Sequence, residues 1–170
     1  PIGLLMEPLK EIQRAEVIVI TKSDSCKPSD IGSLTEEIKK YNADAPIFKS
    51  SHKPSRLINA SGNILPVERL KDRRVFAFCG IGNPDSFFKT LNSTGCEISC
   101  MRSFRAHYKY EQSDIEDIAV ETKRADADLI ITTEKDMIKL KEIVIPETLL
   151  SLAIDFEIED NFYEVVLGEK

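Results

Sequence analysis

The chain has 170 residues, of which 42% are hydrophobic and 31% charged, and its formal net charge is −6. This length and composition indicate a globular protein with a real core, and the negative charge argues against broad, sequence-independent binding of nucleic acid. No apolar run approaches the roughly 18 residues of a membrane span, and a first residue of Pro1 indicates a fragment of a longer protein.

Five apolar runs predict strands that are buried on both faces, which is typical of a parallel sheet. They are Val17–Ile20, Val75–Phe78, Ile98–Met101, Leu129–Ile131 and Leu149–Ile154, with Pro46–Phe48 as a shorter sixth candidate. Helical faces lie between them, made by Ile31, Leu34, Ile38 and Tyr41, by Phe87, Phe88 and Leu91, and by Ile115, Ile118, Ala119 and Thr122. A capping box of Ser113 and Glu116 predicts the start of the last helix. We predict an α/β three-layer sandwich, a mostly parallel sheet of five to six strands with helices on both faces.

We expect a single α/β domain over residues 1–170, with no internal repeat. The segment Ser51–Leu70 breaks the alternation of strands and helices, and Asn59–Asn63 predicts a turn between short extended pieces. The cysteines follow no zinc-binding pattern, so we expect no metal site and a reducing compartment; they are Cys26, Cys79, Cys96 and Cys100.

Two candidate sites follow strands. After Phe78 come Gly80, Gly82 and Asn83, where Asn83 suits a helix N-cap and the glycines permit close approach of a phosphate or carboxylate. After Leu129–Ile131 comes Thr133-Glu134-Lys135-Asp136, in which capping accounts for Thr133, Glu134 and Asp136 but not for Lys135, since a cation is disfavoured at a helix start. A plain strand-to-helix turn remains an alternative at both places.

Two further candidates are a loop and a histidine. Thr21-Lys22-Ser23-Asp24 follows the first strand and resembles the base-reading Asn-Lys-x-Asp loop of nucleotide-binding proteins, with Thr21 in place of Asn. His107 follows the strand that ends near Phe104 and is a candidate acid, base or anion partner. The alternative is a surface histidine held by neighbouring tyrosines.

Several of these motifs together resemble the C-terminal half of the tetraacyldisaccharide 4'-kinases, which phosphorylate a lipid A precursor. The resemblance rests on the order and spacing of Leu4–Leu9, Arg14–Val19, Val75–Pro84, Phe87-Phe88, Phe104–His107 and Thr133–Asp136. It implies transfer of the ATP γ-phosphate to the 4'-hydroxyl of a tetraacyldisaccharide 1-phosphate, with Mg²⁺, at the cytoplasmic face of the inner membrane. The implied partners are the lipid A precursor, the membrane surface and an N-terminal P-loop domain that residues 1–25 contact or join.

The chain departs from that family in two respects. None of its 7 glycines is followed by lysine, so the Gly-Lys-Ser/Thr of a P-loop is absent, and the chain alone is expected to be inactive. The family reads Phe-Pro-Asp-His-His where this chain has Phe104-Arg105-Ala106-His107-Tyr108. The resemblance implies that His107 supports a catalytic Asp of the other domain, while Ala106 has lost the family's carboxylate. The competing hypothesis is a non-catalytic α/β module that binds a nucleotide or phosphorylated ligand.

Overall fold

The structure, a computed structural model, describes residues 7–168. Of the segments used above, Pro1 and Leu4–Met6 lie outside these residues. The chain divides into two compact units: residues 1–52 with 156–170, and residues 53–155. No composition shift marks the division, because two strands, β2 (Ile47–Asn59) and β7 (Leu149–Ile158), each run without interruption from one unit into the other.

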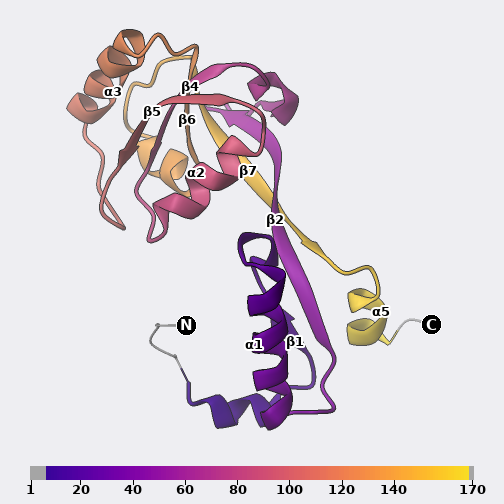
Figure 1. Ribbon diagram of the computed structural model, residues 1–170. Coiled ribbons are helices and arrows are strands. Elements are labelled where there is room, and N and C mark those ends of the chain that lie inside the picture. Colours follow the sequence, from indigo (N-terminus) through magenta and orange to yellow (C-terminus); the bar gives the residue numbers. More distant parts are fainter. Residues whose placement is uncertain (1–6, 169–170) are drawn as a thin grey trace. The chain divides into compact units, whose positions relative to one another are not determined.

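The first unit is small and is built around one pair of strands. Parallel pairing joins β1 (Ile18–Ile20) to the start of β2, with Ile18 opposite Ile47. Figure 1 shows α1 lying along these strands. The other elements of this unit are the 3₁₀ turns η1 (Leu9–Arg14) and η2 (Ser23–Ser25), the helix α1 (Pro28–Tyr41) and the short helix α5 (Phe162–Leu167).

Only part of the predicted apolar face of α1 is buried. Pro28 occupies the first turn, where its missing N–H costs nothing, and Ile38 is buried. Leu34, which the sequence places on the same face, is exposed. The two strands of this unit form a narrow platform, which buries one stripe of the helix and leaves its margin open.

The second unit contains most of the sheet. The remainder of β2 is followed along the sheet by β7, β6, β4 and β5, and β3 pairs with β2 as an antiparallel strand. The pairs β6–β7, β4–β6 and β4–β5 are parallel. The elements are β3 (Ile64–Pro66), η3 (Val67–Leu70), β4 (Arg74–Cys79), α2 (Pro84–Asn92), β5 (Glu97–Ser103), α3 (Gln112–Arg124), β6 (Leu129–Thr133), α4 (Glu134–Met137) and η4 (Ile138–Leu140).

Strand β4 is apolar after its first residue, Arg74, because both of its faces are buried. Alternate side chains along a strand point to opposite faces of the sheet, and both faces of β4 are covered. Val75 and Ala77 pack in a cluster with Phe87 and Leu91 of α2. Phe76 and Phe78 pack in a second cluster, with Ile115 and Ile118 of α3. These two cores confirm the predicted mostly parallel sheet with helices on both faces.

The predicted start of α3 was wrong. The capping box of α3 is formed by Glu111 and Asp114, not by Ser113 and Glu116. Asp114 accepts the backbone N–H of Glu111 at 2.8 Å, so the helix starts at Gln112 and Ser113 already lies inside its first turn. The two candidate capping boxes differ by two residues in where the helix starts, and the spacing of the residues alone did not decide between them.

The segment Ser51–Leu70 is more regular than its polar sequence suggests. Its first part continues β2 as far as Asn59, and β3 returns beside it after the predicted turn. Gly62 closes that turn with φ +82, and its N–H donates to the Asn59 carbonyl at 2.9 Å. The predicted short sixth strand is therefore 13 residues long. Within residues 7–168, no helix is long and apolar enough to cross a membrane.

Candidate functional site

Three loops of the second unit meet at the carboxyl ends of the adjacent strands β6, β4 and β5. The loop after β4 is tied to the next loops by two backbone donors. Gly80 N–H donates to Asp136 Oδ2 at 2.9 Å, and Phe104 N–H donates to the Cys79 carbonyl at 2.8 Å. The sequence motifs around Gly80, His107 and Asp136 therefore come together at one edge, where open α/β sheets bind ligands.

Asp136 is the centre of this arrangement and is fully buried. Besides Gly80 N–H, it accepts from the Thr133 hydroxyl at 2.8 Å and from Lys139 Nζ at 2.7 Å. Lys139 also lies 3.4 Å from the Gly80 carbonyl. A buried carboxylate is costly unless it is paired and hydrogen-bonded, and these three donors meet that requirement. Asp136 therefore ties the loop after β4 to the segment after β6, which goes beyond the capping role that its sequence suggests.

Tyr110 closes the inner side of the cluster. Its ring packs edge-on against Phe78, with centroids 5.7 Å apart, and Lys139 Nζ lies 5.6 Å from the ring centroid. The hydroxyl is buried beside Asp136 and makes no hydrogen bond of good geometry with the described residues. Burial first, and the Asp136 charge second, hold the pKa of Tyr110 well above its ordinary range. Burial likewise raises the pKa of Cys79 to about 11, so this thiol stays protonated at neutral pH.

Gly80 leaves no room for a side chain. A Cβ at this position would lie 2.8 Å from Tyr110 Oη and 3.2 Å from Asp136 Oδ1. Tyr110 cannot swing away, because its ring is enclosed by other aromatic side chains: Phe78, Phe104 and Tyr108.

We expect Gly80→Ala to lower the free energy of unfolding by about 1–3 kcal/mol, as overpacking does in other cores. Urea denaturation measures this loss. Tyr110→Phe removes the atom nearest to the new methyl group, so the double variant should recover part of the loss. Gly82→Ala is the matched control, since nothing lies within 4 Å of a Cβ there. Equal losses at Gly80 and Gly82 would contradict this account of the close packing.

The rest of the Gly80–Pro84 loop starts helix α2 as predicted. Asn83 is the N-cap, its side chain accepts from Ser86 N–H at 3.1 Å, and Pro84 follows in the first turn. Gly82 and Asn83 are exposed, whereas Gly80 is buried. The ligand-binding roles of these three residues remain predictions.

The Thr133–Asp136 motif divides into buried and exposed members. Thr133 is the N-cap of α4, and its hydroxyl oxygen accepts from Asp136 N–H at 3.1 Å. Glu134 is half-buried, and Lys135 is exposed. Within residues 7–168, Lys135 forms no ion pair. Lys135 is therefore available to an anion from elsewhere, as its unfavourable place at a helix start suggests.

We expect Thr133→Ala and Lys135→Ala to separate stability from activity. Loss of the Thr133 cap should lower the free energy of unfolding by about 1 kcal/mol. Lys135→Ala should leave it nearly unchanged and yet slow turnover of a longer enzyme that contains this chain. Melting curves and steady-state kinetics of both variants measure the two effects. A destabilised but fully active Lys135→Ala variant would assign the whole motif to capping.

His107 lies on the exposed turn between β5 and α3. The aromatic residues Phe104, Tyr108 and Tyr110 surround the base of this turn. The side chain of His107 faces solvent and is accessible to a reacting group or a partner. Its proposed catalytic role remains a prediction.

The Thr21-Lys22-Asp24 loop belongs to the other unit. Thr21 and Asp24 are exposed, and Lys22 adopts a left-handed backbone with φ 56. Ser23 lies between Lys22 and Asp24 and donates to the Ser50 carbonyl of β2 at 3.1 Å. The candidate residues thus form two groups, one in each unit.

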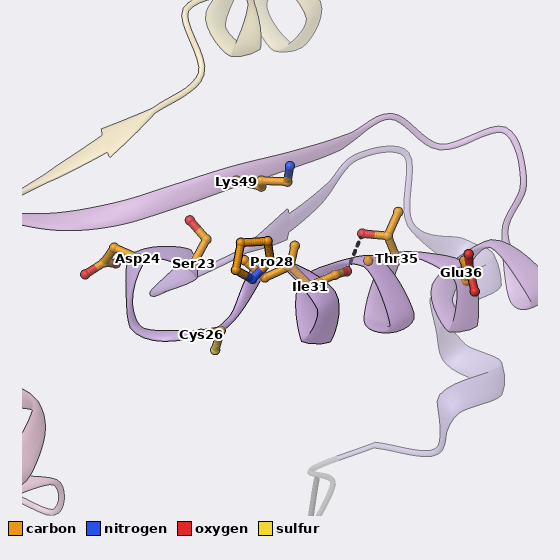
Figure 2. A pocket seen from close by; sticks show the side chains of 9 residues that line it. Ser23, Asp24, Cys26, Pro28, Ile31, Thr35, Glu36 and Lys49 are labelled. Atoms are coloured by element: carbon orange, nitrogen blue, oxygen red, sulfur yellow. Dashed lines mark hydrogen bonds between the residues drawn. The ribbon is translucent and has the colours of Figure 1, made fainter.

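An open hollow of about 680 Å³ lies beside this loop (Figure 2). Figure 2 shows Ser23 and Asp24 at one end, and Lys49 of β2 opposite helix α1. Thr35 is already used within the helix, because its hydroxyl donates to the Ile31 carbonyl at 2.8 Å. Side chains of both charges line the hollow, Asp24 and Glu36 with Lys49, so it could accept a polar ligand.

The described residues contain neither a cluster of metal ligands nor a disulfide. Within residues 7–168, no group of three or more His, Cys, Asp and Glu side chains could hold a metal ion. All four cysteines are free thiols: Cys79 and Cys96 are buried, Cys100 is half-buried and Cys26 is exposed.

Lys139 belongs to this site but was not among the predicted site residues. It lies one helical turn after Asp136, and the spacing of three residues is a signal that could have placed the two side chains on one face. Tyr110 was noted only as a neighbour of His107. Its contact with Gly80 depends on the parallel pairing of β4 and β5, which brings residues distant in sequence together.

The fold and site define an open-sheet α/β protein whose polar and charged loops gather at the carboxyl ends of parallel strands. Comparison with known sequences gives the family. The chain belongs to the family of tetraacyldisaccharide-1-P 4'-kinases, because the model of that family, LpxK, matches residues 1–169.

Individual relatives agree with this assignment. A tetraacyldisaccharide 4'-kinase of Syntrophus aciditrophicus is 33% identical, over 98% of this chain and 47% of the relative. One from Halothermothrix orenii is 30% identical, over 82% of this chain and 39% of the relative. A crystal structure of LpxK from Aquifex aeolicus in complex with ATP is similar with a TM-score of 0.61 and 28% identity, over 99% of this chain and 46% of that one. The chain thus spans about half the length of these relatives.

Proposed function

We propose that this chain is the C-terminal part of a kinase that transfers the ATP γ-phosphate to the 4'-hydroxyl of a tetraacyldisaccharide 1-phosphate. The observation that carries the proposal is the family match over residues 1–169. The catalytic contribution of this chain is His107, which supports or charges a carboxylate of the other part of the enzyme. Its exposed position on a turn leaves the imidazole free to reach such a partner.

The phosphate-handling machinery is assigned to the other part of the enzyme. A P-loop cradles phosphates with backbone N–H groups, a lysine and a hydroxyl on Mg²⁺, and this sequence contains no Gly-Lys-Ser/Thr. The proposal therefore gives this chain no ligand of Mg²⁺ and no catalytic activity alone. Residues 1–25 contact or join the P-loop domain in this proposal.

The remaining candidates are assigned to substrate or nucleotide. Thr21, Lys22 and Asp24 face the nucleotide, because their loop follows β1 and borders the open polar hollow of the first unit. Gly82 and Asn83, which are exposed, approach an anionic group of the substrate, together with Lys135. Gly80 supports them from below, because its N–H already donates to Asp136. The lipid part of the substrate places the enzyme at the cytoplasmic face of the inner membrane, as a peripheral protein.

Unfolding, activity and binding measurements test whether this chain folds alone and depends on the P-loop part for catalysis. The 170-residue chain should unfold cooperatively in urea, and mixing it with ATP, Mg²⁺ and tetraacyldisaccharide 1-phosphate should give no phosphorylated lipid. ATP should bind weakly or not at all in calorimetry, since the P-loop is missing. Tight ATP binding without turnover would favour the alternative, a non-catalytic module for nucleotides. Phosphorylation of the lipid by this chain alone would contradict the proposal.

A further inference from the structure

The backbone of His107 is strained. Its φ is 61, in the left-handed region that residues other than glycine seldom adopt. Such a conformation is unfavourable and persists only when its surroundings fix it. Within residues 7–168, the His107 side chain makes no hydrogen bond, ion pair or ring contact that would offset the cost. The neighbours must therefore hold the turn.

Hydrogen bonds close the turn on both sides of His107. Phe104 N–H donates to the Cys79 carbonyl at 2.8 Å, which fixes the start of the turn to strand β4. Tyr108 N–H donates to the Arg105 carbonyl at 3.1 Å, which closes the turn itself. The rings of Phe104 and Tyr108 then pack together, with centroids 4.6 Å apart and planes inclined by 34°. These two aromatic residues flank the segment that carries His107.

Tyr108 also connects the turn to helix α3. Its hydroxyl donates to Asp114 Oδ1 at 3.3 Å, while Asp114 Oδ2 accepts from Glu111 N–H at the start of the helix. Desolvation, and next the charge of Asp114, raise the pKa of Tyr108, so the hydroxyl keeps its proton and remains a donor. The ring and the hydroxyl of one side chain thus hold the turn at two points.

We propose that Tyr108 is a positioning residue for His107: it holds the turn between Phe104 and helix α3 and so presents the imidazole in one orientation. The catalytic consequence rests on the proposed function, in which His107 acts on a carboxylate of the other part of the enzyme. The geometric part, that Tyr108 keeps the His107 backbone rigid, does not depend on that function.

Backbone relaxation of the 170-residue chain by NMR tests the geometric part. The order parameter of His107 should be about 0.85 in the parent chain and fall below about 0.6 in Tyr108→Leu. Tyr108→Phe, which retains the ring, should give a smaller decrease and guards against loss of the fold. Lys109→Leu, at an exposed neighbour, is the matched control and should leave His107 rigid. An unchanged order parameter of His107 in both Tyr108 variants would overturn the proposal.

A double-mutant cycle in the longer enzyme tests the catalytic consequence. Tyr108→Leu should lower kcat about 10-fold, since small displacements of a positioned group are costly, and leave KM for ATP nearly unchanged. The same change should have no further effect in a His107→Ala background. An equal loss in both backgrounds would mean a general structural role and overturn the positioning of His107. If His107→Ala alone leaves kcat unchanged, the proposed function of His107 is wrong, and the relaxation data still decide the geometric part.

Discussion

Replacement of His107 by alanine should lower kcat of the longer kinase by about 10²–10⁴-fold, the usual contribution of a positioned acid–base group. KM should change much less, because the imidazole is proposed to act on a catalytic carboxylate rather than to bind substrate. Steady-state kinetics over a range of ATP and lipid concentrations separates the two constants.

Two variants control for backbone and charge. His107→Asn retains a residue type that tolerates the left-handed backbone but lacks an ionisable ring, so it should be as slow as His107→Ala. His52→Ala removes the only other histidine, which packs edge-on against Phe156, and should retain kcat. A fully active His107→Asn enzyme would return His107 to the role of a surface residue.

Replacement of Asp136 by alanine should lower the free energy of unfolding by about 3 kcal/mol, near the lower end for breaking a buried ion pair because Lys139 is partly exposed. Three donors lose their acceptor at once: Gly80 N–H, the Thr133 hydroxyl and Lys139 Nζ. Urea denaturation of the 170-residue chain measures the loss. This change is expected to be the most destabilising of those considered, since no other fully buried side chain of the described residues carries a charge.

Asp136→Asn distinguishes the contribution of charge from that of hydrogen bonding. The amide oxygen can still accept from Gly80, but it no longer attracts Lys139, so an intermediate loss is expected. Glu142→Ala, at an exposed carboxylate of the same segment, should change stability by less than about 0.5 kcal/mol. If Asp136→Ala were as mild as Glu142→Ala, the link between the loop after β4 and the segment after β6 would not depend on this carboxylate.

Hydrophobic runs were sufficient to predict the strands β4, β5, β6 and β7 of the second unit. Val75–Cys79 of β4 and Leu129–Ile131 of β6 are apolar because α2 and α3 cover opposite faces of the sheet, and this environment is visible in sequence. The extension of β2 was not visible, since Lys53 and Pro54 interrupt any apolar pattern. The division of the chain within β2 and β7 leaves no sequence mark, because neither strand is broken by a linker.

The site was predicted in part for a similar reason. Motifs at strand ends identified the segments around Gly80, His107 and Asp136, since parallel strands bring their carboxyl ends to one edge. Pairings across that edge were not predictable. The contact of Tyr110 with Gly80 arises from tertiary packing. The pair of Lys139 and Asp136 is local, and its spacing of three residues could have been used to predict it. The tether from Tyr108 to Asp114 also depends on where α3 begins, which the sequence placed at a different capping box.

The central claim is that this chain provides one part of a lipid A precursor kinase whose other part carries the P-loop. The most direct measurement is the amount of 4'-phosphorylated lipid formed from ATP and tetraacyldisaccharide 1-phosphate by three proteins: this chain alone, the P-loop part alone, and both parts in one polypeptide. We expect product only from the joined protein, because His107 and the P-loop then act in one enzyme. Product formed by either part alone, or none from the folded, joined protein, would contradict the account.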